Sequence, residues 1–119
     1  MTHQEAIMAF SQSEKIKGGI IWASTALQSM DALQGMEKRG AEGVIRTLVN
    51  LIAHDVQLSS RIAPDEGWGE VQSFLDQALV MVASGVGFDA VHHLTKALSR
   101  VTTIGQRAMT VLKEEHLLD

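Results

Sequence analysis

The sequence contains no cysteine and no tyrosine, and Pro64 is its only proline. Without cysteine the chain cannot form disulfide bonds, thiolate metal sites or thiol nucleophiles. Only 4% of the residues are aromatic, whereas the strands of β-sandwiches are enriched in aromatic and β-branched residues. These absences favour helices that pack through aliphatic side chains.

Positive charge is also scarce, because 10 Lys and Arg residues stand against 14 Asp and Glu residues and give a net charge of −4. A protein that binds nucleic acid normally presents a basic surface that displaces counterions from phosphates. Here the basic residues are scattered, and the sequence has neither an arginine cluster nor a row of aromatic residues for base stacking. We therefore expect no nucleic-acid partner.

Long apolar runs are missing as well. No stretch approaches the roughly 18 apolar residues that a membrane-spanning helix requires. The first ten residues contain His3, Gln4 and Glu5, where a signal peptide has a basic region followed by an apolar one. We therefore expect a cytoplasmic protein without a membrane partner.

What the sequence does contain is aliphatic residues at helical spacing. Hydrophobic residues make up 45% of the 119 residues, which is enough to fill one core in a single domain over residues 1–119. In the first part of the chain, small or apolar residues recur every three to four positions: Ala6, Ala9, Ser13, Ile16, Ile20, Ala23, Leu27 and Met30. Such a row marks the buried side of a helix, and no segment alternates with the period of two that is typical of strands.

Charged residues, glycine and proline divide the chain into four predicted helices. Lys38 and Arg39 provide cations for the negative end of a helix and Gly40 provides a cap, so the first helix is expected to end there. Pro64 disfavours helical geometry at Ala63 and therefore ends the second helix. The predicted ranges are 3–39, 41–62, from a start between 64 and 70 to Gly85, and from the N-cap Asp89 to 116.

The short connections between these helices favour antiparallel neighbours, which predicts an all-α, up-down-up-down four-helix bundle with long first and last helices. The second helix shows a wide apolar arc, which consists of Val44, Ile45, Leu48, Val49, Leu51, Ile52, Val56 and Ile62. Gly18 and Gly19 leave the course of the first helix open, since each interior glycine costs about 1 kcal/mol relative to alanine. The pair is consistent with a kink, with a break, or with the close approach of a second helix.

The predicted helices carry more apolar surface than one bundle buries. At 1.5 Å per residue, the long first and last helices are expected to overhang their neighbours by about 15 Å at the pole they share. The end of the third helix, residues 78–83, is apolar on all sides. These two regions predict a homo-oligomer or a protein partner, with contacts through Ile7, Phe10, Val80, Met81, Met109, Leu112 and Leu117.

His54 is a candidate for a different function. It projects from the polar face of the second helix, with Asn50, Gln57 and Arg61 close by on the same face. A histidine that accepts a phosphoryl group must be exposed, and a nearby cation or amide stabilises the transferred group. The segment 53–57 looks somewhat like the phosphorylated-histidine segment of sensor kinases and phosphotransfer proteins, and this resemblance implies a phosphorelay protein as the alternative function.

His93 is the second candidate phosphoacceptor. The segment 93–99 is similar to the His-x-x-Lys-Gly pattern of histidine phosphotransfer domains, with Ala97 in place of the glycine. However, His93 falls at the border of the apolar face of the fourth helix, while His92 points outward. Because of this position, His93 is a weaker candidate phosphoacceptor than His54.

Motifs of metal and catalytic sites are absent from the sequence. It has no Glu-x-x-His pair of the kind that holds two metals inside a bundle, no phosphate-binding glycine loop and no nucleophile elbow. We therefore expect no metal and no cofactor, and a binding or structural protein rather than an enzyme. The main hypothesis is a small helical-bundle interaction module that associates with itself.

Overall fold

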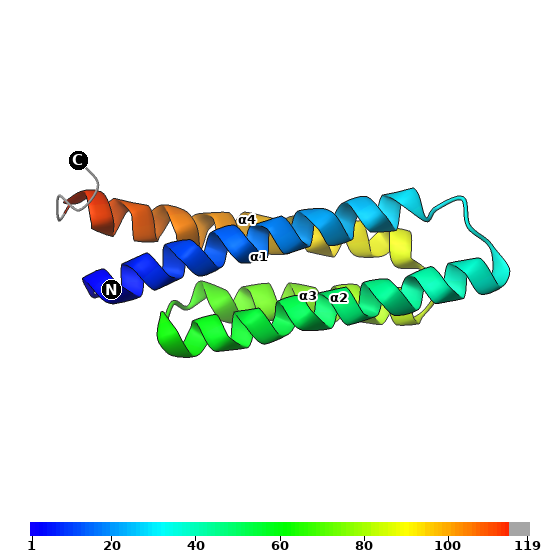
Figure 1. Ribbon diagram of the computed structural model, residues 1–119, viewed down its shortest axis with the longest axis horizontal. Coiled ribbons are helices and arrows are strands. Elements are labelled where there is room, and N and C mark those ends of the chain that lie inside the picture. Colours follow the sequence, from blue (N-terminus) through cyan, green and yellow to red (C-terminus); the bar gives the residue numbers. More distant parts are fainter. Residues whose placement is uncertain (115–119) are drawn as a thin grey trace.

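The computed structural model describes residues 1–114 and consists of four α-helices. They are α1 (His3–Ser29), α2 (Gly35–Ile62), α3 (Gly67–Ala83) and α4 (Gly87–Glu114). Each helix runs opposite to the preceding one, and α1 lies beside α4 and closes the bundle (Figure 1). The predicted all-α, up-down-up-down four-helix bundle is confirmed.

The boundary between the first two helices differs from the prediction. α1 ends at Ser29 and not at Arg39, and α2 begins at Gly35, whose φ of +61° is a conformation that glycine adopts without strain. Lys38 lies near the start of α2, and its cation is placed at the negative end of a different helix, α3. Its Nζ donates a hydrogen bond to the carbonyl oxygen of Gly85, just after α3, at 3.0 Å. As a result α2 has 28 residues, the same as α4, and only α3 is short, with 17.

The glycine pair in α1 marks a close approach between helices, which is one of the three alternatives left open above. α1 continues through both glycines without a break. A Cβ atom added at Gly19 would lie only 3.1 Å from Cγ1 of Ile52, so α2 packs directly against the α1 backbone at this point. Gly18 has open space around the position of its missing Cβ.

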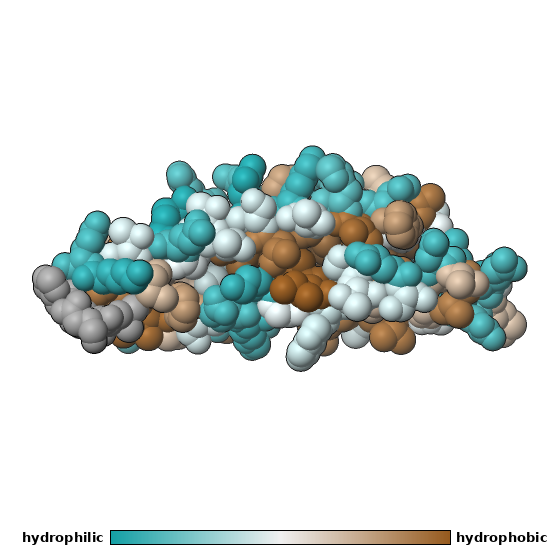
Figure 2. All heavy atoms as spheres, turned by 90° about the horizontal axis from the view of Figure 1, so that it is seen from above, coloured by the Kyte–Doolittle hydropathy of each residue, from teal (hydrophilic) through white to brown (hydrophobic). Residues whose placement is uncertain are grey.

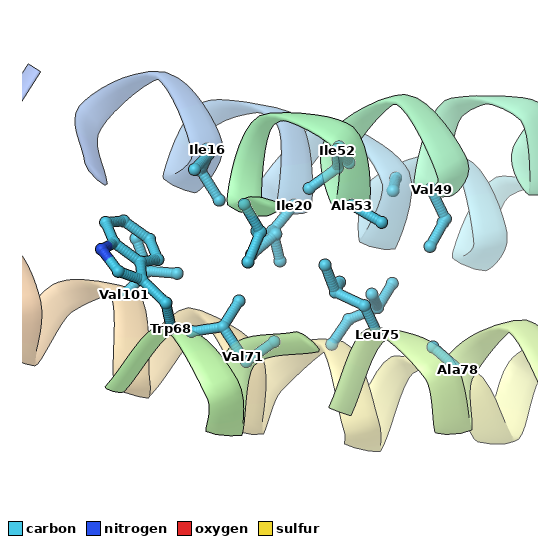
Figure 3. Packing of buried hydrophobic residues seen from close by; sticks show 14 of the residues in the cluster. Ile16, Ile20, Val49, Ile52, Ala53, Trp68, Val71, Leu75, Ala78 and Val101 are labelled. Carbon is cyan, nitrogen blue, oxygen red and sulfur yellow. The ribbon is translucent and has the colours of Figure 1, made fainter. Parts of the chain in front are cut away.

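The core follows a strict heptad spacing on the first three helices. The buried residues of α1 are those predicted from the sequence, and on α2 and α3 the alternating steps of three and four continue through Ile45, Val49, Ile52, Val56, Ser59 and Ala63, then Trp68, Val71, Leu75, Ala78 and Val82. This spacing keeps one side of each helix facing the bundle axis, as in coiled coils. Figure 3 shows side chains from this cluster filling the space between the helices.

Trp68 is the largest fully buried side chain and is 1% exposed. Its indole Nε1 donates a hydrogen bond to the carbonyl oxygen of Ala63 at 3.0 Å, so the one polar atom of the ring is satisfied inside the core. In Figure 3 the ring points from α3 into the bundle interior, near Val101. The indole therefore joins the core to the connection between α2 and α3.

The start of α3 is fixed by a nearly buried carboxylate. The side chain of Asp65 is 6% exposed, and its Oδ1 accepts a hydrogen bond from the N–H of Gly67 at 2.8 Å. Arg107 of α4 donates to the same carboxylate from Nη2 at 2.6 Å and from Nε at 3.0 Å. Burial alone raises the pKa of Asp65, but the hydrogen bonds from Arg107 and Gly67 outweigh it and lower this pKa below its ordinary value.

Candidate functional site

The residues predicted to contact a partner occupy different environments. Ile7 and Val80 are exposed, Phe10 and Met81 are partly buried against the core, and Met109 is partly buried. Leu112 is only 4% exposed, so the expectation that it stays uncovered in a single chain is wrong. It is buried because α4 packs beside α1 and contributes to one continuous core. Leu117 lies outside the described residues.

The structure brings together only Phe10 and Met109 among these residues. Both line a groove of about 260 Å³ between α1 and α4, whereas Val80 and Met81 lie on α3. α1 and α4 approach closely at two lining residues, because a Cβ added at Gly105 would lie 2.7 Å from Oγ of Ser13. Seen from the α1–α4 side, apolar side chains gather near the middle of this face (Figure 2).

The most regular exposed apolar surface lies on α2, away from the residues predicted to contact a partner. Val44, Leu51 and Leu58 are 70%, 60% and 46% exposed, and they follow one another at intervals of seven residues. We call these three residues the α2 stripe. Since seven residues are close to two helical turns, all three side chains project from the same side of the helix.

The α2 stripe is half of a second heptad row. Leu48, Asp55 and Ile62, which are partly buried, fall between and after its members, so that positions 44, 48, 51, 55, 58 and 62 alternate in steps of four and three. The core row of α2 has the same spacing and is offset by one residue throughout, from Ile45 to Ala63. α2 therefore presents one apolar row to the core and a second row to the flank beside α1.

Trp22 of α1 extends this surface. An ion pair between Lys15 and Asp55 at 3.3 Å and the contact between Gly19 and Ile52 fix the antiparallel register of α1 on α2. One turn beyond Gly19, this register brings Trp22 to the level of Leu48. The indole is 72% exposed, and from this register we infer that it lies on the flank of the α2 stripe, level with Leu48.

A signal for this surface was present in the sequence. Val44, Leu48 and Leu51 were assigned together with core residues to one wide apolar arc. An arc of that width exceeds what a single heptad row occupies, and dividing it into two interleaved rows separates the core from the α2 stripe. The exposure of Trp22 could not be predicted in the same way, because a single tryptophan does not form a periodic pattern.

The two candidate phosphoacceptor histidines, His54 and His93, differ in exposure. His54 is exposed on α2, and Asn50, Gln57 and Arg61 are exposed on the same helix. His93 is partly buried, and its Nδ1 is buried without a hydrogen-bond partner in the described part of the chain. His92 is exposed, and its ring meets that of His93 edge to face with 5.7 Å between centroids. Of the two candidates, His54 is the one with an accessible imidazole.

Over residues 1–114, no three His, Asp or Glu side chains gather closely enough to hold a metal ion. The four helices also lack the combination of length and hydropathy with which a helix crosses a membrane. Comparisons with protein-family models, with curated proteins and with solved structures returned no match.

Proposed function

We propose that this protein is a non-enzymatic interaction module that binds an amphipathic helix through the α2 stripe. The observation that carries the proposal is the exposure of Val44, Leu51 and Leu58 at 70%, 60% and 46% with a spacing of seven residues. Single exposed apolar residues are common on protein surfaces and need no explanation. A periodic row is different, because its geometry matches the apolar side of another helix.

The length and the surroundings of the α2 stripe suit a helical partner. From residue 44 to residue 58 the row extends about 21 Å along the helix, which is about four turns. The neighbouring outward residues Thr47, Asn50 and His54 are exposed and carry no formal charge, with histidine neutral. On this side the apolar row therefore has a polar, uncharged border, as at the centre of a protein interface, where charged residues are depleted. The charged residues nearby are Asp55, which is paired with Lys15, and Arg61.

Binding to a synthetic helix tests this proposal. The probe is a fluorescently labelled three-heptad peptide with leucine at its a and d positions, and a peptide of the same composition in scrambled order serves as its control. We expect saturable binding of the heptad peptide by anisotropy. A variant with serine at positions 44, 51 and 58 should bind it about tenfold more weakly or worse, which corresponds to at least 1.4 kcal/mol.

A matched variant with serine at Ile7, Val80 and Val86 removes three exposed apolar side chains outside the α2 stripe. It should bind the heptad peptide as the unmodified protein does. Equal binding of the heptad and scrambled peptides, or equal loss of binding in both variants, would contradict the proposal.

Phosphotransfer through His54 is the second candidate, and the exposure of the imidazole favours it. In this reaction a ring nitrogen attacks the aspartyl phosphate of a response regulator, the bond from phosphorus to the carboxylate oxygen breaks, and a phosphorus–nitrogen bond forms. Incubation with a phosphorylated response regulator should then give an acid-labile phosphoprotein. His54→Gln should abolish the label and His92→Gln should retain it; no label in the unmodified protein excludes this function for the regulator tested.

A further inference from the structure

We infer that the helix bound by the α2 stripe belongs to a second copy of this chain, packed antiparallel with Leu51 at the twofold axis. This inference rests on the proposed function and names the partner for it. A symmetric dimer uses the same patch of both subunits, so the patch must be complementary to itself. The α2 stripe meets this condition, because Val44 and Leu58 lie seven residues before and after Leu51.

The antiparallel arrangement places the three apolar side chains of the α2 stripe opposite one another. With Leu51 at the axis, it contacts Leu51 of the second copy, and Val44 contacts Leu58 of the second copy at both ends. Each end lies about 10.5 Å from the axis at 1.5 Å per residue. Gly40, one turn before Val44, lies level with Ile62 of the second copy and has no side chain to obstruct it.

The distribution of charge favours this direction over a parallel one. Asp55 and Arg61 lie beside the α2 stripe after Leu51, whereas Thr47 and Gly43, beside the stripe before Leu51, are uncharged. Glu37, one heptad before Val44, is the charged residue in line with the stripe on that side. In a parallel dimer, Asp55 would face Asp55 and Arg61 would face Arg61, which is unfavourable. In the antiparallel dimer, Asp55 lies near Thr47 of the second copy, and no like charges are opposed between residues 40 and 62.

The apolar surface available is of the size that a modest dimer requires. Burial of an aromatic side chain removes about 150–250 Å² from water, and burial of an aliphatic one roughly 60–120 Å². Two copies of Trp22 and of the α2 stripe therefore bury on the order of 1,000 Å², near the lower limit of specific interfaces. We expect a dimer with a dissociation constant on the order of micromolar.

Disulfide trapping tests the geometry directly, because the natural chain has no cysteine and any introduced thiol is the only one. Leu51→Cys should give a disulfide-linked dimer under mild oxidation, since residues at the axis can reach the Cα separation of about 4.4–6.8 Å that a disulfide needs. Val44→Cys and Leu58→Cys should each cross-link weakly alone and efficiently when mixed. Ser99→Cys, on the exposed side of α4, measures the rate of random collision. These positions are exposed, so circular dichroism should show unchanged helicity.

Three outcomes overturn the inference, and each is distinct from failure of the proposed function. A monomeric mass by light scattering at tens of micromolar excludes the second copy, while binding of the heptad peptide would still support the interaction module. Efficient cross-linking of Val44→Cys with itself establishes a parallel dimer and excludes the antiparallel one. A dimeric mass without cross-linking above the Ser99→Cys rate at any stripe position places the dimer contact elsewhere on the molecule.

Discussion

Replacing Trp68 with alanine is expected to lower the free energy of unfolding by about 3–5 kcal/mol. The indole is 1% exposed and belongs to the core cluster. Its removal leaves a cavity, because the surrounding core residues are already packed against one another. The substitution also leaves the carbonyl oxygen of Ala63 without the donor that it has in the native protein. Since single domains are stable by only about 5–15 kcal/mol, the variant should be near the limit of folding.

Trp22 provides the matched control for this substitution, because the chain has two tryptophans and the second is 72% exposed. At submicromolar protein concentration, where the proposed dimer is dissociated, Trp22→Ala should change stability by no more than about 0.5 kcal/mol. Urea denaturation followed by far-UV circular dichroism measures both variants. Equal losses from the two substitutions would contradict the placement of Trp68 in the core. In a Trp22→Phe background, Trp68 fluorescence reports unfolding without interference.

Asp65→Asn is expected to cost about 2 kcal/mol at neutral pH, because hydrogen bonds to charged groups are worth roughly 1.5–3 kcal/mol. The substitution preserves the shape of the side chain but removes the charge that Arg107 contacts through two hydrogen bonds. Glu14→Gln, which removes one member of an exposed ion pair with Lys17, should cost less than about 0.5 kcal/mol. Urea denaturation at neutral pH measures both losses.

The contribution of the Asp65 carboxylate to the free energy of unfolding should decrease as the pH is lowered. Its pKa in the folded protein is lowered, whereas in the unfolded chain it is about 3.9. The carboxylate therefore stabilises the folded protein fully above the unfolded value, and this stabilisation is lost as the pH falls through the folded pKa. The difference between the natural protein and Asp65→Asn should shrink below about pH 4. A difference that stays constant down to the lowest pH at which both proteins fold would contradict this account.

The core could be predicted from the sequence because its spacing has one physical cause. A helix that buries one side against three others must place small or apolar residues every three to four positions, and the row from Ala6 to Met30 shows this spacing without interruption. The end of α1 at Ser29 could not be predicted from this spacing. Lys38 and Arg39 are appropriate for the end of a helix, but only the folded chain shows that the helix end nearest to Lys38 is that of α3.

The candidate surface could be predicted less well, because exposure depends on what other helices cover. Leu112 and the members of the α2 stripe are all aliphatic residues at helical spacing, and the sequence alone does not separate them. Packing of α4 beside α1 buries Leu112, while α1 covers only one side of the second row on α2. Which of two apolar rows faces the core is decided by tertiary contacts, and these contacts are not local in the chain.

The position of α4 between α1 and α3 has a consequence for synthesis of the chain. While residues 87–114 are still inside the ribosome, the sides of α1 and α3 that α4 covers have only water or each other as neighbours. Unshielded aliphatic surface of this kind favours aggregation of nascent chains. A translational pause within the codons for α4 would prolong that exposure, whereas a pause between the first two helices would leave much less such surface outside the ribosome.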